Sequence, residues 1–141
     1  MTTVVKATTP RASAFPDKVE ILALVEAALA WNLDSTALPA VTDALAMAQR
    51  FTDFGRLVAD DLEAQVLSLP AGSELGNGAR AILGEASRRL YLRPLSQTAA
   101  PRPAAHRAQN LARLVQSLSR KFSEVSQEQV HSRSIEAPQR E

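Results

Sequence analysis

The chain has 141 residues, and its 45% hydrophobic content is enough for one domain with a core of its own. Sixteen basic residues against fifteen acidic ones leave a formal charge of +1, so no strong overall field attracts nucleic acid or anionic lipid. The absence of cysteine excludes disulfides, thiolate nucleophiles and cysteine-ligated metal centres. Two histidines, His106 and His131, are too few for a multi-histidine metal site within one chain, and no cofactor is expected.

The two ends of the chain differ from its middle. The first residues lack the apolar run of a secretory signal, and nowhere do about twenty apolar residues follow one another. We therefore expect a cytoplasmic protein that does not enter a membrane. Residues 1–15 and 126–141 are polar and have no apolar period, which predicts a disordered N-terminal segment and a flexible polar tail around one domain at 16–125.

The first half of that domain predicts two helices. "PDKVEILALVEAALAW" begins with Pro16 and Asp17, both favourable at a helix N-terminus. Its apolar residues at helical spacing are Ile21, Leu24, Val25 and Ala28. The second helix opens near Pro39 and keeps an apolar period to Leu69. At roughly thirty residues it would be about 45 Å long, and we expect it to be the spine of the fold.

The second half predicts two more helices. After the glycine-rich break "LPAGSELGNG", Asn77 is a suitable N-cap for the third helix, whereas Pro103 suits the first turn of the fourth. The third helix carries the apolar series Ala79, Ile82, Leu83, Ala86 and Leu90. The fourth carries Ala104, Ala108, Leu111, Val115, Leu118, Phe122 and Val125. Narrow apolar stripes without any alternating strand pattern predict an all-α antiparallel bundle of four helices with a long second helix.

Charge is divided between the two halves. Residues 1–70 carry five basic and nine acidic side chains, whereas residues 71–125 carry nine basic and three acidic ones. One interpretation is attraction between helix pairs at the rim of the bundle, where each exposed pair contributes less than about 1 kcal/mol. The other is a basic surface for a partner.

The third helix offers the first candidate for such a surface. On a helical wheel, Arg80, Gly84, Arg88 and Tyr91 cluster away from the buried stripe. An exposed glycine beside arginines and a tyrosine would let another backbone or an anion approach closely. Alternatively, Gly84 fits beneath a neighbouring helix or is simply a weak point, since glycine inside a helix costs about 1 kcal/mol.

A second candidate surface is apolar. Met47, Phe54 and Leu57 lie on the second helix outside its main stripe. They suit a seam for a protein partner or a homodimer, because exposed aromatic and Met side chains are enriched at interfaces. The alternative is that they contact a third helix within the bundle.

A rival interpretation is a nucleic-acid-associated regulator. His106, Arg113 and Arg120 recur at intervals of seven on the polar face of the fourth helix, and Arg80 and Arg88 add charge from the third. An ordinary amphipathic helix has the same pattern, and no aromatic side chains interleave for base stacking. We also find no short helix-turn-helix.

Catalysis is not expected. Asp60, Asp61 and Glu63 are an acidic cluster whose members diverge around the helix, and no nucleotide-binding, hydrolase or metalloprotease motif occurs. A third interpretation is a carrier with a ligand pocket between helices, left by small inward-facing side chains, or else those side chains allow close packing. They are Ala44, Ala48, Gly55, Ala79, Ala86 and Ala108.

The segments, in their order along the chain, are similar to those of a known family. "ALPAVTDALAMAQRFTDFGRLVADDLEAQVLSLP", "ARAILGEASRRLYL" and "AHRAQNLARLVQSLSRKFSEV", within about residues 38–125, resemble an uncharacterised actinomycete family labelled natural product biosynthesis proteins. The most distinctive elements are "GEASRRL" at Gly84 to Leu90 and "LARLVQSL" at Leu111 to Leu118. The resemblance implies a small helical protein of antibiotic-producing bacteria, encoded near biosynthetic genes, with no established reaction.

One departure from that family limits what can be carried over. Its members often have a histidine in the middle of the long helix and another near the end of the last helix. This chain has Gly55 and Arg56 in the first region, and Lys121 and Phe122 in the second. A histidine-dependent role is therefore not expected here. The leading expectation is a non-catalytic interaction module, accessory or regulatory in secondary metabolism, that binds a protein partner or itself.

Overall fold

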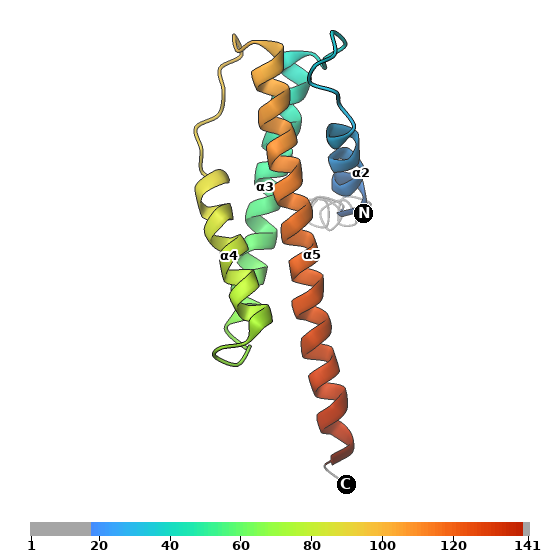
Figure 1. The fold of residues 1–141 in the computed structure, drawn as a ribbon, viewed down its shortest axis with the longest axis vertical. Helices are drawn as coiled ribbons and strands as arrows, with labels where there is room; N and C mark the ends of the chain where they lie inside the picture. Colours follow the sequence, from blue (N-terminus) through green and yellow to red (C-terminus); the bar gives the residue numbers. More distant parts are fainter. Residues whose placement is uncertain (1–17, 140–141) are drawn as a thin grey trace, which may run out of the picture.

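The computed structural model describes residues 18–139, which form four α-helices and no strand (Figure 1). They are α2 (Lys18–Leu29), α3 (Val41–Val66), α4 (Glu74–Arg89) and α5 (Pro101–Gln139). Consecutive helices run in opposite directions. The predicted all-α antiparallel bundle with a long second helix is confirmed. The N-terminal segment predicted at 1–15 lies outside the described residues.

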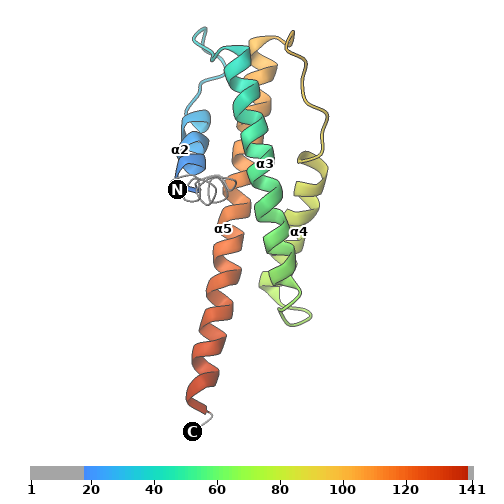
Figure 2. The same cartoon turned by 180° about the vertical axis from the view of Figure 1, so that it is seen from behind.

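The second and fourth helices, α3 and α5, run parallel and form the central pair of the bundle. They pack along each other, while α2 and α4 lie on opposite sides of the pair (Figures 1 and 2). Within the described chain, α2 and α4 do not contact each other, whereas α5 contacts all three other helices. The spine is therefore α5, not the second helix as the sequence suggested.

The fourth helix is also longer than its apolar stripe. Instead of ending near residue 125, α5 continues to Gln139, so the segment expected to be a flexible tail from 126 is helical through that residue. Extending an existing helix needs no new nucleation, and the glutamine, glutamate and arginine residues of this segment are good helix formers. Its beginning is also attached to α3, because Ser126 Oγ donates to Gln65 Oε1 at 3.1 Å.

The third helix begins earlier than predicted, with a different cap. Ser73 is the N-cap, and its side-chain oxygen accepts a hydrogen bond from the backbone N–H of Gly76 at 3.1 Å. Gly72, at φ +83°, makes the turn that precedes it. Asn77 is inside the helix, where its Oδ1 accepts from Arg80 Nη1 at 3.1 Å. Two of the three glycines that suggested a loop, Gly76 and Gly78, therefore lie in the first turns of α4.

The core is continuous through all four helices. Its largest fully buried side chains are Phe51, Ile21, Leu62, Leu90, Leu118, Val25, Val115 and Val125. All six small residues expected to leave a pocket are buried. At Gly55 a Cβ atom would lie 2.9 Å from Leu90 Cδ2, so glycine lets the Leu90 side chain pack directly against the backbone of α3. These small side chains therefore allow close packing of the helices, and of the six only Ala48 also lines a cavity, which is described below.

Amide side chains of α5 bind carbonyl groups at the ends of α2 and α3. Gln109 of α5 is buried and donates through Nε2 to the carbonyls of Ala28 at 2.9 Å and Trp31 at 3.1 Å, where α2 ends. Gln129 Nε2 donates to Gln65 O near the end of α3 at 3.2 Å. Ala28 O also accepts from Trp31 N–H at 3.2 Å and Gln65 O from Ser68 N–H at 3.0 Å, so these amides add hydrogen bonds between helices at carbonyls that remain accessible near the helix ends.

Candidate functional site

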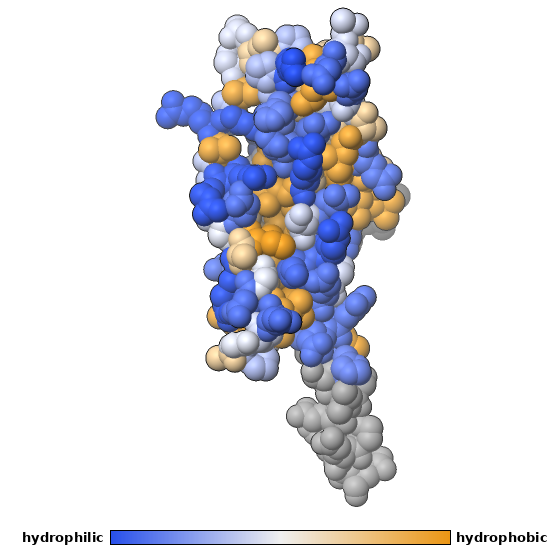
Figure 3. All heavy atoms as spheres, viewed as in Figure 1, coloured by the Kyte–Doolittle hydropathy of each residue, from blue (hydrophilic) through white to orange (hydrophobic). Residues whose placement is uncertain are grey.

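The predicted row on α4 is exposed and open. Arg80, Gly84 and Arg88 follow one another at four-residue spacing, and both arginines are exposed. A Cβ atom built at Gly84 would meet nothing within 4 Å beyond its own helix. The alternative in which Gly84 fits beneath a neighbouring helix is therefore wrong. Polar side chains cover most of the molecular face seen in Figure 3, with apolar side chains exposed among them.

The C-terminal end of this row is held by a residue that the sequence analysis did not select. Arg56 of α3 donates to the carbonyl of Leu90, at 3.1 Å from Nε and 2.7 Å from Nη2. Its guanidinium carbon also lies 4.4 Å from the centre of the Tyr91 ring, a cation–π contact. Tyr91 is 63% exposed and Leu92 is 51% exposed. Arg56 thus fixes the backbone at Leu90 and the ring of Tyr91, which forms an exposed pair with Leu92.

Charge on α4 is only partly compensated. Glu85 accepts from Arg88 Nη2 at 2.7 Å and from Arg89 Nε at 2.8 Å. The hydrogen bond from Arg88, followed by the charge of Arg89, holds the pKa of Glu85 below its usual value. One carboxylate therefore serves two guanidinium groups. Arg80 has no carboxylate partner among the residues that the structure describes.

The prediction of an exposed apolar surface on α3 is wrong for its central residue, Phe54. Phe54 is 7% exposed and belongs to the core, and Met47 is partly buried against that core. Leu57 alone of the three is exposed, and with Phe54 and Phe122 it lines a hollow of about 180 Å³. The third-neighbour alternative therefore holds for Met47 and Phe54. A seam for another protein is left with only one of its proposed residues.

The basic row on α5 is exposed as predicted, but it is bonded within its own helix. His106, Arg113 and Arg120 all lie on the solvent side. Arg113 donates to Asn110 Oδ1 at 3.2 Å and to Gln109 Oε1 at 3.4 Å. In residues 18–131, no hydrogen bond or ion pair connects this row to Arg80 or Arg88.

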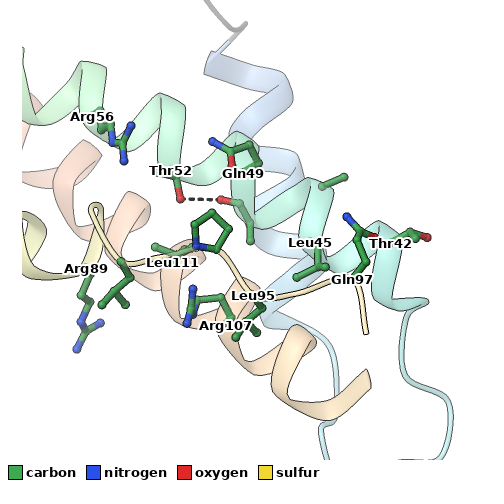
Figure 4. Close-up of a pocket in the computed structure, with 14 residues that line it drawn as sticks. Thr42, Leu45, Gln49, Thr52, Arg56, Arg89, Leu95, Gln97, Arg107 and Leu111 are labelled. Carbon is green, nitrogen blue, oxygen red and sulfur yellow. Dashed lines mark hydrogen bonds between the residues drawn. The ribbon is translucent and has the colours of Figure 1, made fainter. Parts of the chain in front are cut away.

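A larger cavity of about 520 Å³ lies near the end of α4, and of the six small residues considered for a pocket only Ala48 lines it. Its walls come from α3, the end of α4, the connection after α4, and α5 (Figure 4). The fourteen lining residues are Thr42, Leu45, Ala46, Ala48, Gln49, Thr52, Arg56, Arg89, Leu92, Pro94, Leu95, Gln97, Arg107 and Leu111. No acidic residue is among them, and three are arginines.

The sequence missed this cavity because the path of the connection creates it. Residues 90–100 contain no regular helix, and Arg107 of α5 holds them by donating to the carbonyl of Arg93 at 3.0 Å. Arg56 holds the start of the same segment at Leu90. The only available signal was the Pro-rich composition of the connection, which says nothing about where it runs.

The acidic cluster on α3 is not part of a metal site among the described residues. Asp60, Asp61 and Glu63 are all exposed on α3. Among residues 18–139, no three histidine or acidic side chains gather where they could hold a metal ion. The helices described are also too short or too polar to cross a bilayer.

Comparison with known proteins gives a family without an assigned activity. No curated protein and no solved structure matches the chain. A family of unknown function, DUF6415, matches residues 19–127, which takes in α2, α3, α4 and most of α5. Because this match covers well over half of the chain, including the α4 row and the lining of the cavity, the chain belongs to the DUF6415 family of unknown function.

Proposed function

We propose that this protein is a non-catalytic helical interaction module that binds a protein partner, or a second copy of itself, through the α4 surface. We define the α4 surface as Arg80, Gly84, Arg88, Tyr91 and Leu92. The observation that carries the proposal is the exposed Tyr91–Leu92 pair, which Arg56 holds in place at the end of the arginine row.

The composition of the α4 surface is typical of the residues that dominate binding energy. Tyrosine and arginine are enriched among interface hot spots, and a ring that is already fixed loses little conformational entropy on binding. Of the large apolar side chains exposed in the described chain, only Tyr91 and Leu92 are sequence neighbours. The open flank of Gly84 adds room for a partner's backbone.

The biological setting of the proposal comes from the resemblance to natural product biosynthesis proteins. It supports an accessory or regulatory role in secondary metabolism, exercised in the cytoplasm. The thin inventory of catalytic groups in the sequence agrees with a binding role rather than an enzymatic one.

Site-specific photo-crosslinking in the source organism tests the proposal. A benzophenone amino acid replaces Arg88, on the α4 surface, or Leu67, which is 84% exposed beyond the end of α3. We expect a protein adduct from position 88, which mass spectrometry identifies as a partner or as this chain. Adding Tyr91→Glu and Leu92→Glu to the position-88 variant should remove the adduct, because two charges would be placed in the apolar centre of the contact.

The position-67 variant is the matched control, since it reports random encounters of an exposed apolar site. The same adducts from both positions, or none from position 88, would overturn the proposal. Analytical ultracentrifugation separates the two versions, because self-association predicts a dimer of the purified wild type that the double glutamate variant loses.

A further inference from the structure

We infer that the cavity of about 520 Å³ between α3, α5 and the 90–100 connection is a binding site for a small amphipathic anion: an apolar body carrying one carboxylate, phosphate or sulfonate group. This site adjoins the protein contact proposed above and shares only Leu92 with the α4 surface.

The size and lining of the cavity fit such a ligand. Small-molecule sites have volumes of about 300–1,000 Å³, with mainly apolar walls and a few placed polar groups. Leu45, Leu95 and Leu111 supply apolar surface from three different elements. Thr42, Gln49, Thr52 and Gln97 supply uncharged hydrogen-bonding groups. An apolar body would therefore contact the leucines while polar atoms meet the amides and hydroxyls.

The charge of the lining selects an anion. Arg56 and Arg107 are partly buried, and neither has a carboxylate partner in the part of the chain that the structure describes. The third arginine, Arg89, is already paired with Glu85. Gln49 connects the lining to an acid, Asp53, at 2.9 Å, but that pair is exposed. Two partly desolvated guanidinium groups without counter-charges thus favour an anionic group.

Both arginines keep hydrogen-bonding capacity for a ligand. A guanidinium group has five N–H donors. Arg107 donates one of them to Arg93 O, and Arg56 donates two to Leu90 O. Because those bonds already fix the two side chains, the remaining donors are oriented before the ligand arrives, which reduces the entropic cost of binding.

A matched pair of fluorescent probes tests this site. 8-Anilinonaphthalene-1-sulfonate carries the proposed anionic group, and N-phenyl-1-naphthylamine has the same aromatic body without it. We expect saturable one-to-one binding of the sulfonate, at least roughly tenfold tighter than the neutral probe, since a hydrogen bond to a charged group is a strong contributor. Decanoate should displace the bound sulfonate probe, whereas decanol should displace it much less.

Three variants locate the binding. Arg107→Gln should weaken binding of the sulfonate probe roughly tenfold and leave the affinity for the neutral probe unchanged, because the substitution removes only the charged contact. Arg102→Gln, on the same helix but outside the lining, is its control. Ala46→Trp places a large ring at an exposed position of the lining and should abolish binding of both probes.

Circular dichroism checks that each variant keeps its helices, and Ala46→Trp keeps the test decisive if Arg107→Gln does not fold. Equal affinity for the two probes, unchanged binding by Ala46→Trp, or no binding to the wild type would each overturn the inference.

Discussion

Gly84 lies in the middle of α4 with open space where a side chain would be. Glycine in a helix interior is less stable than alanine because the unfolded chain has more freedom to lose. We expect Gly84→Ala to raise the free energy of unfolding by roughly 0.5–1 kcal/mol, measured by urea denaturation. Gly55→Ala is the matched control, because its Cβ would meet Leu90 Cδ2 at 2.9 Å and should bring no such gain.

A destabilising Gly84→Ala would contradict this account, since it would require a close neighbour that the structure does not contain. A stabilised Gly84→Ala also separates stability from binding. If Gly84 gives a partner room on the α4 surface, larger residues at this position should weaken that contact even when the helix becomes more stable.

Glu85 gives a pH-dependent prediction at the residue scale. Its pKa is lowered from 4.5, first by the hydrogen bond from Arg88 and then by the charge of Arg89. A lowered pKa in the folded state means that the contribution to stability is complete above the unfolded pKa and is lost as the pH falls through the folded value. NMR titration of the Glu85 carboxyl should give a midpoint below 4.5 in the wild type and a higher one in Arg88→Gln.

The control for that titration is Arg80→Gln, on the same helix, which should leave the Glu85 midpoint unchanged because Arg80 bonds to Asn77 and not to Glu85. An unchanged Glu85 midpoint in Arg88→Gln would show that the exposed ion pair is broken in solution, which is common for surface pairs.

At the scale of elements, the helix ends are joined by amides and guanidinium groups rather than by ion pairs. Although the two halves of the sequence differ in charge sign, Arg102–Asp34 is the only ion pair between them in the described chain, and both side chains are exposed. Gln109 and Arg56 connect the halves through backbone carbonyls instead. The opposite charges of the halves therefore contribute little specific contact.

We expect the polar side chain of Gln109 to stabilise the folded state strongly. It is buried, and its amide binds two carbonyls where α2 ends. Gln109→Met preserves most of the volume but removes both amide hydrogen bonds, although Trp31 N–H still donates to Ala28 O. We expect a loss of about 1–3 kcal/mol in the free energy of unfolding. Gln116→Met, a half-buried position on the same helix, is the control. Equal effects of the two would contradict the capping role.

The basic row of α5 should not bind nucleic acid strongly. Arg113 is bonded within its own helix, and the row has no interleaved aromatic side chains. We expect no electrophoretic shift of duplex DNA or single-stranded RNA at 50 to 150 mM salt. At the upper end of this range the Debye length is about 8 Å, so interactions between exposed charges farther apart are largely screened. A shift that weakens steeply with salt, and is lost in the Arg113→Gln and Arg120→Gln double variant, would instead support the nucleic-acid alternative.

The sequence could predict the elements but not all of their limits. Apolar periods at three and four residues placed all four helices, because the core-facing stripe is a local property of each helix. Ser73 was missed as a cap because three glycines nearby favour a loop, and Phe54 was placed outside because its helix is covered from more than one direction. The helical continuation from residue 126 has no apolar stripe to reveal it.

At the scale of the whole molecule, the parallel α3–α5 pair determines both candidate sites. Pairing the second and fourth helices leaves α4 at one side, so the chain must travel from the end of α4 back to the start of α5. That return path forms one wall of the cavity, and its first residues include Tyr91 and Leu92. No local pattern encodes which helices pair, so these features required the three-dimensional structure.

The same arrangement predicts the order in which the bundle opens. With only twelve residues, α2 buries three of them, Ile21, Val25 and Ala28, whereas α5 contacts every other helix. Segments with few buried contacts open locally at lower free energy than the global unfolding. Native-state hydrogen exchange should therefore show faster exchange for amides of α2 than for residues 108–118 of α5. Gln109→Met should further accelerate amide exchange in α2 without changing exchange in α4, because the substitution removes an attachment of α2 alone. Equal protection of α2 and α5, with Gln109→Met affecting all four helices alike, would mean that the bundle opens only as a single unit.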